Sequence, residues 1–222
     1  MTRTDFPRLY PILDASFLPV ERQAREAMLS SLVTGLADAG VGILQYRNKT
    51  GDMAALAADA RVMLSAPHGA MQLILNDHPE LVNELGFDGV HVGQTDASPA
   101  EARERIGPAR ILGISTHNDA QLRAASTAPV DYVAIGPVYA TSSKANPDPV
   151  VGLEGVRLAR ALTEKPIVAI GGIGREQARE VFTAGADSIA VISAVFPQHA
   201  GTDAQRVESA IQRARAFLAF CG

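Results

Sequence analysis

The sequence has almost no cysteine and no long hydrophobic run, and each absence excludes a class of protein. Its 222 residues include one cysteine, Cys221, which excludes an internal disulfide bond and a cysteine-based metal cluster. The apolar runs are short and are interrupted by glycine and polar residues, so none can span a bilayer. Residues 1–7 lack the apolar segment of a secretory signal. We therefore expect a soluble protein of the reducing cytoplasm.

An excess of basic residues is missing as well. Lys and Arg number 20 and Asp and Glu number 24, which gives a formal net charge of -4 at pH 7. Proteins that bind nucleic acid or anionic membranes usually carry a basic excess, so we expect neither partner. An anionic small-molecule ligand would have to bind at a local cluster of positive side chains.

Short β-branched or leucine-rich segments are present and alternate with longer segments of helical periodicity. They are apolar on both faces, as buried parallel strands are. Eight such units without a flexible linker predict a single-domain (β/α)8 TIM barrel over residues 1–222, and an open doubly wound sheet is the alternative. The expected strands are Leu9–Leu13, Gly42–Tyr46, Leu73–Asn76, Gly89–Val92, Ile111–Ile114, Tyr132–Ile135, Ile167–Ile170 and Ser188–Val191.

The intervening segments carry helix boundary signals. Asp52 is expected to cap a helix that begins at Met53, and residues 98–101 and 118–121 both fit a capping box. Glycines that follow helical segments are expected to take the left-handed conformation; they are Gly40, Gly86 and Gly185.

Polar side chains follow the predicted strands, and in a barrel the carboxyl ends of all strands open into one mouth. In chain order these residues are Gln45, Arg47, Lys49, Asn76, Asp77, His91, Gln94, Asp96, Ser115, His117, Thr141, Ser142, Ser143, Lys144, Gly171, Gly172, Ile192 and Ser193. The connection from 136 to 152 is longer than most and is a candidate lid, or else a tolerated surface insertion.

Several of these residues also have a structural interpretation. Arg47 and Lys49 could be solvated loop charges, and Asp77 is as compatible with a helix cap as with function. Asp96 has no evident local role, because Ser98 caps the following helix better, so we expect it to bind a ligand. The histidines at 91 and 117 are expected to be hydrogen-bonded structural residues.

The residue types together indicate a metal-diphosphate site. Two carboxylates, Asp77 and Asp96, suit Mg²⁺, which takes one or two protein carboxylates together with water and substrate phosphate. Positive side chains beside them would neutralise a polyanion. Gly171 and Gly172 form either a tight turn or a second phosphate site. No cysteine or Ser-His nucleophile pair accompanies them, which favours departure of diphosphate over a covalent enzyme intermediate.

At these residues the chain resembles thiamine phosphate synthase, also called thiamine-phosphate pyrophosphorylase, over nearly its whole length. The matching motifs are Leu-Gln-Tyr-Arg-Asn-Lys at 44–49, Leu-Ile-Leu-Asn-Asp at 73–77, Gly-Val-His-Val-Gly-Gln-Thr-Asp at 89–96, Gly-Ile-Ser-Thr-His at 113–117, Gly-Pro-Val-Tyr-Ala-Thr-Ser-Ser-Lys at 136–144 and Ile-Gly-Gly-Ile at 170–173. One motif alone is weak evidence, but six in the same order are specific.

The resemblance implies a TIM barrel that joins hydroxymethylpyrimidine diphosphate to thiazole phosphate with Mg²⁺, giving thiamine phosphate and pyrophosphate. It implies that Asp77 and Asp96 bind the metal and that Arg47, Ser115 and Lys144 are catalytic. The pyrimidine diphosphate would contact Gln45, Arg47, Lys49, Asn76, Ser115 and Lys144. The second substrate would contact Thr141, Ser143, Gly172, Ile192 and Ser193, where Ser143 replaces the usual threonine of the family and keeps its hydroxyl.

Two other functions stay open from the sequence. Thiazole tautomerases are similar barrels, but a histidine stands in that family where this chain has Pro137. A non-catalytic phosphate-metabolite sensor could use the same mouth for binding alone. A homo-oligomer is possible, and the sequence does not identify its interface.

Overall fold

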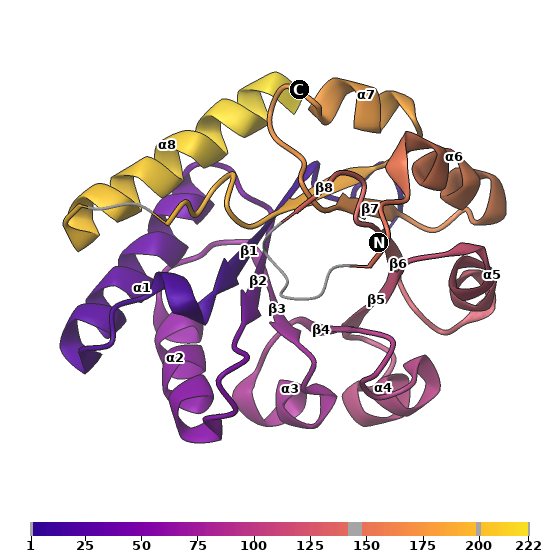
Figure 1. Ribbon diagram of the computed structural model, residues 1–222. Coiled ribbons are helices and arrows are strands. Elements are labelled where there is room, and N and C mark those ends of the chain that lie inside the picture. Colours follow the sequence, from indigo (N-terminus) through magenta and orange to yellow (C-terminus); the bar gives the residue numbers. More distant parts are fainter. Residues whose placement is uncertain (1, 142–147, 199–200, 222) are drawn as a thin grey trace.

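Eight parallel strands close into a barrel that is surrounded by helices, as Figure 1 shows. The computed structural model describes residues 2–141, 148–198 and 201–221. Neighbouring strands pair in chain order, and β8 returns to β1 through pairs such as Leu9 with Ile189. The predicted TIM barrel is therefore confirmed. The alternative of an open sheet is wrong, because β1 pairs with β8 and no strand of the described residues is left at an edge.

The strand and helix bounds lie within two residues of the predicted ones where a prediction was made. The strands are β1 Leu9–Asp14, β2 Ile43–Arg47, β3 Gln72–Asn76, β4 Gly89–Val92, β5 Ile111–Thr116, β6 Tyr132–Ile135, β7 Ile167–Ile170 and β8 Ser188–Val191. The helices are η1 Ala15–Phe17, α1 Arg22–Asp38, α2 Met53–Ser65, α3 Pro79–Leu85, α4 Pro99–Ile106, α5 Asp119–Thr127, α6 Gly152–Leu162, α7 Ala178–Thr183 and α8 Asp203–Cys221. Within the described ranges no helix is both long and apolar enough to cross a membrane.

The strands are apolar on both faces because they separate two packed layers. The larger layer lies between the outside of the barrel and the helices, and it includes Leu32, Leu75 and Val156. The smaller layer fills the inside of the barrel, where Tyr10 and Tyr132 are almost completely buried. Since the interior is filled below, a ligand can reach the barrel only at its mouth.

The local signals at the helix ends are largely confirmed. Asp52 caps α2 by accepting a hydrogen bond from the Ala55 backbone, and the capping box before α4 is complete on both sides. The second box differs: the Gln121 side chain accepts from the backbone N–H of His117, one residue earlier than expected. The three expected glycines have φ values of 92°, 95° and 115°; they are Gly40, Gly86 and Gly185.

Candidate active site

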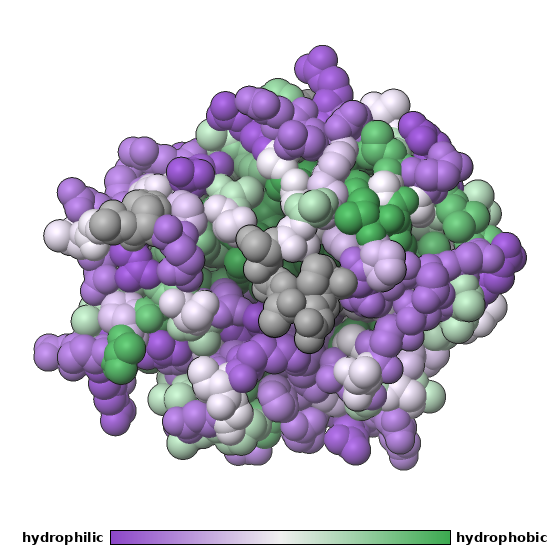
Figure 2. Space-filling model, viewed as in Figure 1, coloured by the Kyte–Doolittle hydropathy of each residue, from purple (hydrophilic) through white to green (hydrophobic). Residues whose placement is uncertain are grey.

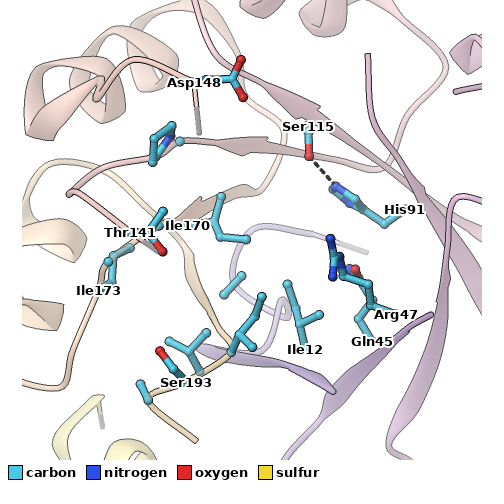
Figure 3. A pocket seen from close by; sticks show the side chains of 18 of the residues that line it. Ile12, Gln45, Arg47, His91, Ser115, Thr141, Asp148, Ile170, Ile173 and Ser193 are labelled. Carbon is cyan, nitrogen blue, oxygen red and sulfur yellow. Dashed lines mark hydrogen bonds between the residues drawn. The ribbon is translucent and has the colours of Figure 1, made fainter. Parts of the chain in front are cut away.

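A cavity of about 340 Å³ opens at the carboxyl ends of the strands. One wall carries Gln45 and Arg47 from β2, His91 from β4 and Ser115 from β5, and all four side chains lie close together in Figure 3. Of the residues predicted at the strand ends, those that line this cavity are Gln45, Arg47, Asn76, His91, Ser115, His117, Thr141, Gly171, Gly172, Ile192 and Ser193. Segments far apart in the chain therefore meet here as the sequence predicts.

Arg47 is held at the cavity wall by an ion pair with Asp14 at the end of β1. Asp14 also accepts hydrogen bonds from the backbone and the hydroxyl of Ser16, at 3.0 and 2.6 Å. Burial by itself would raise the pKa of Asp14, but the bonds from Ser16 and the Arg47 guanidinium outweigh it and keep that pKa below its ordinary value. Arg47 is thus an oriented, paired cation and not a solvated loop charge.

Lys49, Asp77 and Asp96 line a second depression of about 550 Å³, which is separate from the cavity and is formed by the loops that follow β2, β3 and β4. The Lys49 ammonium pairs with Asp77, whose φ of 69° is in the left-handed region. The α3 N-cap is His78 and makes no side-chain cap bond, so the structure does not support the capping interpretation of Asp77.

Asp96 has a local structural role that the sequence analysis missed. Its Oδ2 accepts the backbone N–H of Gly93 at 2.7 Å, which ties the loop after β4 to itself. Burial raises the pKa of Asp96, and the hydrogen-bonded, negatively charged Asp77 beside it raises that pKa further, while Gly93 and Lys49 act in the opposite direction. The expectation that Asp96 lacked a local role is therefore wrong.

The chemistry of this carboxylate pair suits a divalent cation. Asp77 and Asp96 repel each other, which a dication between them would relieve. In the described part of the chain no group of three or more His, Cys, Asp or Glu residues is placed to bind a metal by itself. Two carboxylates without further protein ligands are the set that Mg²⁺ uses when substrate phosphate and water complete its shell.

Hydrogen bonds join Gln45 to Ser115 across the inside of the barrel. Gln45 Nε2 donates to the Tyr10 hydroxyl at 3.1 Å, and the Tyr10 and Tyr132 hydroxyls are 2.9 Å apart. The His91 ring is stacked against that of Tyr132; its Nδ1 lies 2.8 Å from the Tyr132 hydroxyl and its Nε2 lies 2.8 Å from Ser115 Oγ. His91 is a hydrogen-bonded residue as predicted, but it contacts a predicted catalytic side chain.

The Gly171-Gly172 pair has a packing reason that does not depend on phosphate. Both residues have positive φ, 100° and 64°. A Cβ on Gly172 would lie 2.4 Å from the Ala140 carbonyl oxygen, and a Cβ on Gly171 would lie 2.5 Å from Pro137 Cβ. The tight turn is therefore confirmed, and phosphate binding at the same backbone stays a prediction.

The wall opposite Ser115 carries Thr141, Ile173 and Ser193, as Figure 3 shows. Near its rim, His117 Nδ1 lies 2.6 Å from the Gly136 carbonyl oxygen and its Nε2 lies 3.5 Å from Asp148. Predicted residues Ser143 and Lys144, and most of the candidate lid, lie outside the described residues. In Figure 2, hydrophilic side chains predominate on this face on the side of α2 to α4.

A buried cluster behind β2 fixes the strand that carries Gln45 and Arg47. Asp59 of α2 pairs with Arg25 of α1 at 2.6 Å and accepts from the Tyr46 hydroxyl. Asn48 donates to that hydroxyl at 3.3 Å and, through its Oδ1, accepts from the Thr50 backbone at 2.9 Å. The loop between Arg47 and Lys49 is thereby anchored to two helices.

Asp14 and Tyr132 are two site residues that sequence reasoning missed. Asp14 ends β1 as Arg47 ends β2, so a survey of all eight strand ends, including the first, would have found it. Tyr132 begins its strand at the far end from the mouth, and only the length of its side chain brings its hydroxyl to His91. No signal of spacing in the sequence marks that contact.

Comparisons with known proteins identify the family of the chain. A family model described as Thiamine monophosphate synthase matches residues 10–195. A thiamine-phosphate synthase of Koribacter versatilis is 51% identical over 187 residues, which cover 84% of this chain and 88% of the relative. One of Agrobacterium fabrum is 38% identical over 202 residues, with 88% and 89% covered.

Among solved structures, a thiamine phosphate pyrophosphorylase of Pyrococcus furiosus superposes with a TM-score of 0.76 at 27% identity, covering 99% of this chain and 98% of that one. Sequence family, relatives and fold thus agree over most of the length. The chain belongs to the thiamine monophosphate synthase family, and it is a transferase.

Proposed function

We propose that the protein joins hydroxymethylpyrimidine diphosphate to thiazole phosphate and releases pyrophosphate, with Mg²⁺ as the metal. One observation carries the proposal: cationic, amide and hydroxyl groups of Arg47, Gln45, Asn76 and Ser115 meet in one cavity, beside a paired set of carboxylates. Acyl or glycosyl transfer through an enzyme nucleophile would need an activated side chain, whereas this donor set suits an anionic leaving group.

The pyrimidine end of the first substrate would lie against β2 and β3. Asn76 is almost completely buried, and its Nδ2 has no hydrogen-bond partner among the described residues, so the amide can donate to a ring nitrogen. Gln45 uses one N–H on Tyr10 and keeps a carbonyl for the ring amino group. These two amides would fix the orientation of the ring.

The diphosphate would lie between Arg47, Ser115 and Lys49, with Lys144 as a further cation from outside the described residues. Asp77 and Asp96 would hold Mg²⁺, which when bound neutralises part of the charge on the leaving diphosphate. The thiazole phosphate would use the opposite wall, with Thr141 and Ser143 near its ring and Gly172, Ile192 and Ser193 at its phosphate.

The reaction proposed is a dissociative substitution. The bond between the pyrimidine methylene carbon and the diphosphate oxygen breaks, and its electron pair leaves with pyrophosphate. The electron-rich aminopyrimidine stabilises the methylene cation until the thiazole nitrogen donates its lone pair to form the new C–N bond. Arg47 and Ser115 stabilise charge on the departing oxygens, where oriented donors act most strongly.

The test is to follow pyrophosphate and thiamine phosphate together, with both substrates and Mg²⁺, and with chelator and single-substrate controls. We expect equal release of the two products and none with chelator. Lys49→Met and Lys144→Met should each lower kcat by at least about a hundredfold. Arg105→Met is the matched control, since Arg105 lines the same depression as Lys49 but pairs with Glu80. Thiazole phosphate binding without coupling would favour the tautomerase or sensor alternatives.

A further inference from the structure

We propose that the buried chain of hydrogen bonds from Gln45 to Ser115 has one fixed direction, which holds His91 as its neutral Nε2–H tautomer and turns the Ser115 hydroxyl hydrogen into the cavity. Tyr10, Tyr132 and His91 would then be positioning residues for Ser115. The substrate named for Ser115 rests on the proposed function, whereas the tautomer of His91 does not.

The direction follows from counting hydrogens, beginning at Gln45. Its Nε2 can only donate, so the Tyr10 oxygen accepts there. Within the described part of the chain, the Tyr10 hydroxyl meets just one other polar group, the Tyr132 hydroxyl at 2.9 Å. The hydrogen of Tyr10 therefore goes to Tyr132, because a buried hydroxyl left without an acceptor costs free energy.

The same count continues to the other end. The Tyr132 oxygen accepts from Tyr10, so its own hydrogen goes to Nδ1 of His91 at 2.8 Å. A neutral imidazole that accepts at Nδ1 carries its hydrogen on Nε2, which donates to Ser115 Oγ at 2.8 Å. Ser115 therefore acts as an acceptor toward His91, and its single hydrogen, which has no acceptor among the described residues, can be directed into the cavity.

The reverse direction fails at one position. If Ser115 donated to His91 and the hydrogens ran toward Tyr10, the Tyr10 oxygen would accept from both Gln45 and Tyr132, and its own hydrogen would have no acceptor among the described residues. Tyr10 is 1% exposed and Tyr132 is fully buried, so water does not relieve that deficit. Burial also raises the pKa of both phenols, which keeps both hydrogens in place at neutral pH.

The consequence is chemical. A serine whose hydrogen is committed to histidine presents lone pairs to an anion and repels it, whereas a serine that accepts from histidine presents its O–H. Ser115 would thus donate to the diphosphate oxygens and strengthen that bond as charge develops on them. The same geometry argues against a Ser-His nucleophile pair, because His91 donates to Ser115 and cannot take its proton.

The direct test is the tautomer of His91 in the ligand-free protein, read from the ¹⁵N shifts and N–H couplings of its ring at neutral pH. The signal is assigned by its loss in His91→Gln. We expect a hydrogen on Nε2 and none on Nδ1. A hydrogen on Nδ1, or on both nitrogens, overturns the proposal whatever the enzyme catalyses, and this measurement needs no variant of Tyr10 or Tyr132 to fold.

Kinetics give a second, graded test. Tyr132→Phe removes the donor to Nδ1, so we expect kcat to fall about three- to tenfold, the value of one hydrogen bond, with KM for the pyrimidine diphosphate within about twofold. Tyr10→Phe should cost less, because Tyr132 can still donate to His91. A kcat of Tyr132→Phe within about twofold of the wild-type value, or a fall in Tyr10→Phe as large as that in Tyr132→Phe, would overturn the positioning role. An inactive wild type would refute only the proposed substrate.

Discussion

Gly113→Ala should damage the protein severely, although it adds a single methyl group to a strand. Gly113 lies on β5, two residues before Ser115, and faces the ring of Tyr132. A Cβ at this position would lie 2.0 Å from Tyr132 Cζ and 2.4 Å from its hydroxyl oxygen. Carbon atoms in contact are about 3.5–4.0 Å apart, so the ring would have to move by about 1.5 Å.

Such a movement has a cost that can be estimated. The hydrogen bonds between the Tyr132 hydroxyl and His91 and Tyr10, which are 2.8 and 2.9 Å long, would lengthen beyond hydrogen-bond range. Overpacking costs about 1–3 kcal/mol and each buried hydrogen bond about 1 kcal/mol, so the free energy of unfolding should fall by about 3–5 kcal/mol. Because the ring no longer holds His91, kcat should fall at least as far as in Tyr132→Phe.

Urea unfolding at equilibrium measures the first effect, and the coupled product assay measures the second. Gly86→Ala is the control: its φ of 95° strains an alanine, but nothing lies within 4 Å of the added Cβ, so it should cost about 1 kcal/mol. If Gly113→Ala were no more destabilising than this control, Tyr132 would not be wedged against β5 and the argument from its position would be refuted.

Three further perturbations test other parts of the site. Asp59→Ala leaves the Arg25 guanidinium without its carboxylate and should lower the free energy of unfolding, measured in urea, by about 3–5 kcal/mol. Glu26→Ala, which removes the exposed partner of Arg22, should cost less than about 0.5 kcal/mol. Equal costs would contradict the anchoring role of Asp59. The folded protein raises the pKa of Asp96, so ionisation of this carboxyl opposes folding once the pH rises above the ordinary aspartate pKa. Asp96→Asn should therefore raise the thermal unfolding midpoint, measured in chelator at pH 7, and should abolish Mg²⁺-dependent turnover. A lower midpoint would contradict this reasoning. The lowered pKa of Asp14 has the opposite sign: its stabilisation is present above the ordinary aspartate pKa and is lost as the pH falls through the folded value. The stability difference between wild type and Asp14→Asn, about 1 kcal/mol at pH 7, should therefore vanish in acid, and a pH-independent difference would exclude this linkage.

Most of the fold could be predicted because local and global signals agree. Each strand is apolar on both faces, and both faces are buried, one against helices and one inside the barrel. Caps such as Asp52 and Ser98 are decided by hydrogen bonds within four residues, so they are visible in the sequence. The box at 118–121 shows the limit, since Gln121 had two backbone donors within reach and bonds to the less expected one.

The site was predictable only as far as strand ends decide it. Gln45, Asn76 and Ser115 line the cavity because the carboxyl end of each parallel strand points to the same mouth. Contacts across the barrel are set by side-chain length and by missing side chains, such as the Gly113 that admits Tyr132. Pairings such as Arg47 with Asp14 join residues 33 positions apart, and neither spacing nor composition identifies them.

The ion pairs at the mouth bear on how an acidic protein would bind the polyanion of the proposed function. Arg47 is paired with Asp14 and Lys49 with Asp77, and with Asp96 these five groups carry one net negative charge. A bare diphosphate that took Lys49 from Asp77 would leave Asp77 unpaired beside Asp96 at a partly buried position, which is costly. A diphosphate that arrives with a divalent cation gives Lys49 a phosphate oxygen and gives Asp77 and Asp96 a metal, so these three charges each keep a partner, while Arg47 can keep Asp14 on one nitrogen and contact phosphate with another. On the proposed function, the ligand-free pairs are therefore what selects the metal complex over the free anion.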